Sequence, residues 1–146
     1  MNPNLNAAPD VYARIVSFDT FDGGSLDDSL RAELEELAWS SRYADANPGR
    51  HTIGPHADAV LDIAYIVDTP PRGRFSIALP SRRHRDRRGR PMQYHDVVFG
   101  HGGTYLLQFE VASEADGFVP TRWQVFITYD GGDELTVDPL TRINDN

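Results

Sequence analysis

The sequence predicts an α+β domain in which a curved, mostly antiparallel sheet of about six or seven strands packs on one long N-terminal helix. Three observations predict this class. A helical apolar stripe follows the first β-rich run. The later apolar segments are short and rich in β-branched and aromatic residues. Short turn sequences join these segments, which favours antiparallel neighbours.

Length and composition indicate one domain over residues 1–146. A chain of 146 residues with 40% hydrophobic and 25% charged residues can bury a substantial core. Residues 1–10 are polar and have neither the basic nor the apolar region of a secretory leader, so we expect a loose arm. No apolar run approaches the roughly 20 residues that span a bilayer. The chain has no cysteine, and we expect a cytoplasmic protein that makes no membrane contact.

The first strand and the helix occupy the N-terminal third. Val11–Phe18 is rich in β-branched and aromatic residues and predicts a strand, which the turn sequence Phe21–Gly24 ends. Ser25 is a suitable N-cap, with Asp28 three positions later as in a capping box. The apolar positions that share one helical face are Leu26, Leu30, Leu34, Leu37 and Ala38. We expect the helix to end between residues 42 and 46, because Pro48 disfavours helix before it.

Two hairpins are expected after the helix. Ala59–Val67 and Phe75–Leu79 are apolar runs joined by Pro70–Gly73. Gln93–Phe99 and the following run, 104–111, flank a glycine-rich turn at residues 100–103. Neither glycine sequence in the chain stands between a strand and a helix, so we interpret both as turns and not as phosphate-binding loops.

The last expected hairpin pairs Thr121–Tyr129 with Glu134–Val137 across the turn at 130–132. In the first of these strands, Trp123, Val125 and Ile127 alternate with polar residues, which predicts one buried face. Phe126 interrupts the alternation. The polar segment 114–120 is expected to be a loop, and the residues after 137 are polar.

The strongest functional feature is an Arg-rich loop at residues 80–92. Its segment 82–90 holds six of the fourteen basic residues, all of them Arg: Arg82, Arg83, Arg85, Arg87, Arg88 and Arg90. Without this segment the chain has 8 basic and 21 acidic residues, a formal charge of −13 compared with −8 for the whole. Such a segment can bind carboxylates or phosphates, or it can lie on the acidic surface of its own chain. Nucleic acid is disfavoured, since the chain is acidic and no aromatic residue interrupts the segment.

Acidic residues form two groups along the chain. The first group contains Asp19, Asp22, Asp27, Asp28, Glu33, Glu35 and Glu36, and the second contains Glu110, Glu114, Asp116, Asp130, Asp133, Glu134 and Asp138. Such surfaces keep a protein soluble, and they also bind basic partner proteins. Trp39, Tyr43 and Trp123 are the aromatic residues that could anchor such a contact if they are exposed.

Catalytic residues are weakly indicated. Asp62 lies inside an apolar run, where an inward carboxylate would act as an acid or base, and His95 or His101 with Asp96 could act as a general base. The histidine spacings are not those of a helical metal site, so we expect no metal and no cofactor. No serine lies in a nucleophile elbow.

These observations favour a small acidic interaction protein that binds, and could neutralise, a partner with a basic surface. Bacterial immunity and antitoxin proteins are similar in size and charge only. A small-molecule-binding or hydrolytic or isomerising enzyme, with a pocket between sheet and helix, is the first alternative. Contact with an anion or nucleic acid through the segment 82–90 is the second. A homodimer through an edge strand is also compatible with the sequence.

Overall fold

The computed structural model describes residues 8–20, 36–39, 51–53, 59–67, 73–80, 94–95 and 98–143. These residues form antiparallel sheets, which confirms the sheet part of the predicted class. The expected helix falls mostly outside the described residues. Its described part, residues 36–39, is not helical: Glu36 and Trp39 form isolated antiparallel bridges.

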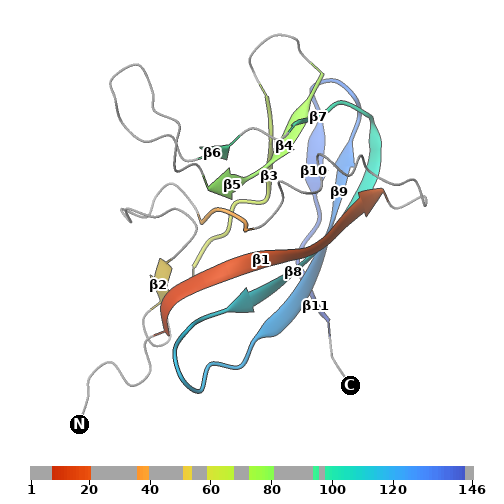
Figure 1. Cartoon of the computed structure of the whole chain (residues 1–146). Coiled ribbons are helices and arrows are strands. Elements are labelled where there is room, and N and C mark those ends of the chain that lie inside the picture. The colour runs from red at the N-terminus through yellow and green to blue at the C-terminus, as the bar shows by residue number, and fades with distance from the viewer. Residues whose placement is uncertain are drawn as a thin grey trace, which may run out of the picture.

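The largest sheet contains β1 (Ala8–Thr20), β2 (His51–Ile53), β8 (Gly103–Ala112), β9 (Thr121–Tyr129) and β10 (Leu135–Val137) in the order β10-β9-β8-β1-β2. A further strand, β11 (Thr141–Ile143), pairs with β9. Figure 1 shows β1, β8 and β9 running side by side as the long strands of this sheet. β1 begins inside the segment expected to be a loose arm, and Val16 has no partner in the register with β8, which indicates a bulge.

Five shorter strands lie between β2 and β8 in the sequence. β3 (Ala64–Ile66), β4 (Phe75–Ile77) and β7 (Val98–Phe99) form a three-stranded sheet in the order β3-β4-β7. β5 (Leu79–Pro80) and β6 (Tyr94–His95) form a separate two-stranded ladder. The hairpin expected between residues 59 and 79 is confirmed at β3 and β4, although both strands are shorter than predicted.

The strands are shorter because each apolar run changes its hydrogen-bonding partner along its length. Leu61 forms a bridge with Trp39, whereas three residues later Ala64 is paired with Ile77. Ala78 donates its N–H to the Ile63 carbonyl and accepts from the Ala38 N–H, both at 2.8 Å. The segment 36–39 therefore links the edge of β1 to the segment around residues 61 and 78.

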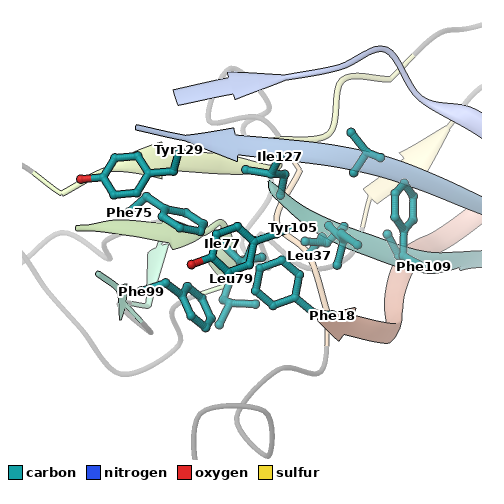
Figure 2. Close-up of a cluster of buried hydrophobic side chains, with 13 residues drawn as sticks. Phe18, Leu37, Phe75, Ile77, Leu79, Phe99, Tyr105, Phe109, Ile127 and Tyr129 are labelled. Carbon is teal, nitrogen blue, oxygen red and sulfur yellow. The ribbon is translucent and has the colours of Figure 1, made fainter. Parts of the chain in front are cut away.

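The core lies between the six-stranded and the three-stranded sheets, and Figure 2 shows side chains of both sheets meeting there. Phe75 of β4 is fully buried, with ring centroids 5.3 Å from Phe99, 5.1 Å from Tyr105 and 5.1 Å from Tyr129. Aromatic pairs at such separations contribute about 0.5–1.5 kcal/mol each beyond the area they bury. Leu37 joins this core with an exposure of 0%, so the apolar stripe correctly identified a buried residue and incorrectly assigned it to a helix.

The alternation predicted for β9 is confirmed. Val125 and Ile127 are buried, Trp123 packs against the core, and Arg122 and Thr128 are exposed on the opposite face. A strand with one buried and one polar face is typical of an antiparallel sheet that is covered on one side only.

Candidate functional site

The Arg-rich segment lies between β5 and β6 in the sequence. Leu79 pairs with His95 and Pro80 pairs with Tyr94, so residues 81–93 connect two neighbouring strands. The sequence predicted a loop here, but it did not predict that the strands before and after it pair with each other. The six Arg residues themselves, like Tyr43 and Asp96, lie outside the described residues.

The described catalytic candidates do not converge on one site. His101 is exposed in the turn between β7 and β8, whereas half-buried Asp62 lies beyond the other end of β3, where its N–H donates to the Ala38 carbonyl at 3.0 Å. His95 belongs to β6. Within the described ranges, no group of three or more His, Asp or Glu side chains is arranged to hold a metal ion. The same part of the chain contains no helix long and apolar enough to cross a membrane.

The two described tryptophans lie in different environments. Trp39 is 5% exposed, and its indole N–H donates to the Val11 carbonyl at 2.9 Å. The expectation that Trp39 is an exposed anchor is therefore wrong, because its ring belongs to the packed interior of the protein. Trp123 is half-buried, and its indole N–H donates to Thr121 Oγ1 at 2.9 Å, so part of its ring remains at the surface.

The six-stranded sheet has two ends with different chemistry. We call the end with the turns at 73, 100–103 and 130–133 the glycine end. We call the end with the loop Ser113–Pro120 the loop end. Since β8 and β9 are antiparallel and joined by that loop, the two ends lie at opposite termini of the same hairpin (Figure 1).

Three turns pack backbone against backbone at the glycine end. A Cβ on Gly102 would lie 3.2 Å from the carbonyl carbon of Asp130, and one on Gly73 would lie 3.3 Å from the Gly131 oxygen. Glycine is favoured where backbones approach this closely, because a Cβ would force its neighbour to move by a few tenths of an ångström. The Tyr105 hydroxyl donates to the His101 carbonyl at 2.6 Å, which ties one turn to the core.

Asp130 organises the β9–β10 turn. Its Oδ1 accepts the N–H groups of Gly132 at 2.7 Å and Glu134 at 3.1 Å. These hydrogen bonds, the one from Gly132 foremost, hold the pKa of the Asp130 carboxyl below its usual value of 3.8. The Tyr129 hydroxyl donates to the Gly132 carbonyl at 2.9 Å, and burial, followed by the charges of Asp130 and Asp133, raises the pKa of this phenol above 10.0. The turn is therefore ordered and negatively charged.

The polar face of the sheet carries an ion-paired group. Glu110 lies 3.5 Å from Arg14 Nη2 and 3.6 Å from Arg122 Nε. Strand pairing places these three side chains in one row across β1, β8 and β9. Arg14 and Arg122 therefore place their positive charge against Glu110 of the same chain.

The edge formed by β10 and β11 has features that natural sheets use against pairing with another chain. The two strands are short and are separated by residues 138–140, which include Pro139. Proline has no N–H to donate, and exposed Asp138 precedes it. These features act against strand pairing at this edge, and the homodimer through an edge strand stays a prediction.

The loop end contains a feature that the sequence reasoning missed. Val119 is 75% exposed, and it follows half-buried Phe118 in the last part of a loop that the sequence identified only as polar. The apolar run at 118–120 within an otherwise acidic segment was the indication available in the sequence. Comparison with known families, curated proteins and solved structures finds no match.

Proposed function

We propose that this chain is an acidic protein-interaction domain whose partner presents a basic surface. The observation that supports it is the charge of the exposed described side chains. The exposed carboxylates are Asp10, Glu114, Asp116, Asp130, Asp133, Glu134 and Asp138, and the exposed guanidinium groups are Arg14, Arg122 and Arg142. Two of these guanidinium groups already contact Glu110.

Charge of this kind acts mainly on recognition and association rate. A negative surface attracts a positive partner over about 10 Å at moderate ionic strength and repels negatively charged competitors. The Asp130 carboxylate is held by two backbone N–H groups of its turn, so this group loses little conformational freedom when it meets a partner. The segment 82–90 would remain available for a second contact or for the chain's own acidic surface. Neutralisation of a basic toxin or nuclease is one role that such binding would serve.

The test is affinity capture from a lysate of the cells that encode the chain, at low and at moderate salt. The bound protein is identified by mass spectrometry, purified, and mixed with the chain to measure stoichiometry. An unrelated acidic domain of similar size and charge serves as the control bait. One basic protein that binds stoichiometrically to this chain only, and more weakly as salt increases, is the expected result. Retention of nothing beyond what the control retains would contradict the proposal.

A further inference from the structure

The β8–β9 loop carries the most exposed large hydrophobic residue of the described part of the chain. Val119 is 75% exposed, whereas the next most exposed large hydrophobic residues, Leu140 and Val16, are at 44% and 43%. Phe118 before it is half-buried and Pro120 after it is exposed, so three consecutive apolar residues lead from the loop into β9. An exposed apolar group favours contact with a partner, because binding removes it from water.

Two hydrogen bonds and one glycine define the shape of this loop. Phe118 donates its N–H to the Ala115 carbonyl at 3.3 Å, and the Ala115 N–H donates to Ser113 Oγ at 3.1 Å. Gly117 has a φ of 82°, a value that glycine adopts readily and other residues rarely adopt. Internal hydrogen bonds of this kind reduce the conformational entropy that a turn loses on binding, which lowers the cost of binding.

The residues around Val119 indicate which kind of partner this side chain fits. Glu114 and Asp116 are exposed beside it, and the sequence from Ser113 to Thr121 contains no basic residue. The half-buried ring of Trp123 lies on the strand that leaves the loop. An exposed apolar side chain beside carboxylates is complementary to an apolar depression bordered by Arg or Lys side chains.

We propose that the loop end, formed by the loop Ser113–Pro120 and Trp123, is the surface that contacts the partner, with Val119 as its apolar anchor. The partner would be a protein with a cationic surface around an apolar depression. This inference rests on the proposed function, since it assigns that function to one of two acidic ends. The glycine end carries comparable charge but only polar and glycine residues at its exposed turn.

The experiment compares two charge-reversed variants by titration against the purified partner. One carries Glu114→Arg with Asp116→Arg at the loop end, and the matched control carries Asp133→Arg with Glu134→Arg at the glycine end. Both change the net charge equally, and all four residues are exposed. We expect the loop-end variant to bind at least about tenfold more weakly and the control less than about threefold more weakly. Equal losses would show long-range attraction only and would overturn the assignment.

A second pair of variants tests the anchor without a change in charge. We expect Val119→Ser to weaken binding about tenfold, and Leu140→Ser, on the exposed β10–β11 edge, to leave it within about twofold. Urea unfolding of each variant confirms that its stability is unchanged. Unaltered affinity of the Val119→Ser variant would overturn the anchor and leave the proposed function intact. If no variant and no wild-type chain binds a protein, the proposed function fails, and the surface assignment fails with it.

Discussion

Replacement of Phe75 by Ala tests the packing of the three-stranded sheet on the six-stranded sheet. The ring is 0% exposed and lies between Phe99, Tyr105 and Tyr129, with centroid separations of 5.1–5.3 Å. Removing a buried phenylalanine ring costs about 3–5 kcal/mol, because apolar burial is lost and a cavity remains. Tyr105 and Tyr129 are held at their hydroxyl ends by the turns, so we expect limited collapse and a loss in the upper half of this range.

The assay is equilibrium unfolding in urea, followed by the fluorescence of Trp39 and Trp123. A domain of this size has a free energy of unfolding of about 5–15 kcal/mol, so Phe75→Ala could abolish folding. Phe75→Leu, which keeps an apolar side chain of intermediate volume, should then still fold with a loss of about 1–2 kcal/mol. Val119→Ala is the control, and we expect a change within about 0.5 kcal/mol because the residue is exposed. A loss below about 1 kcal/mol for Phe75→Ala would refute the described packing of the two sheets.

Three further predictions concern single contacts. Gly102→Ala should lower the free energy of unfolding by about 1–3 kcal/mol, since its Cβ would lie 3.2 Å from the Asp130 backbone, and an unchanged urea midpoint would contradict this. Asp130→Asn should make the free energy of unfolding fall less steeply as the pH is lowered. The N–H of Gly132 stabilises the ionised carboxyl group, so the wild type keeps this contribution above pH 3.8 and loses it as the pH falls through the lowered pKa. A variant that follows the wild-type acid limb would show that the carboxylate contributes nothing. Trp39→Phe should cost about 1–3 kcal/mol in urea unfolding, since the buried carbonyl of Val11 loses its donor; a neutral result would refute that hydrogen bond.

The sequence by itself determined the features that depend on neighbouring residues. Side chains alternate between the two faces of a strand, so the pattern of Thr121–Tyr129 specified both the strand and its buried face. The turn at 130–132 was identified because glycine and Asp favour turn conformations locally. The hairpin expected across residues 100–103 was wrong, since β7 pairs with β4 and β8 pairs with β1 and β9. The imbalance of charge was equally visible, because it needs only the composition.

Tertiary structure decided the features that depend on distant partners. β2 and β11 are three residues long, and a strand this short exists only because β1 or β9 supplies its hydrogen bonds. Leu37 and Ala38 fitted an apolar helical stripe. Their backbones instead form bridges or hydrogen bonds with β1 and the segment around residues 61 and 78. Periodicity reports which residues are buried, whereas the partner of each backbone N–H depends on chain segments far away in the sequence. The exposure of Val119 was decided in the same way, because nothing in residues 118–120 specifies which elements pack over them.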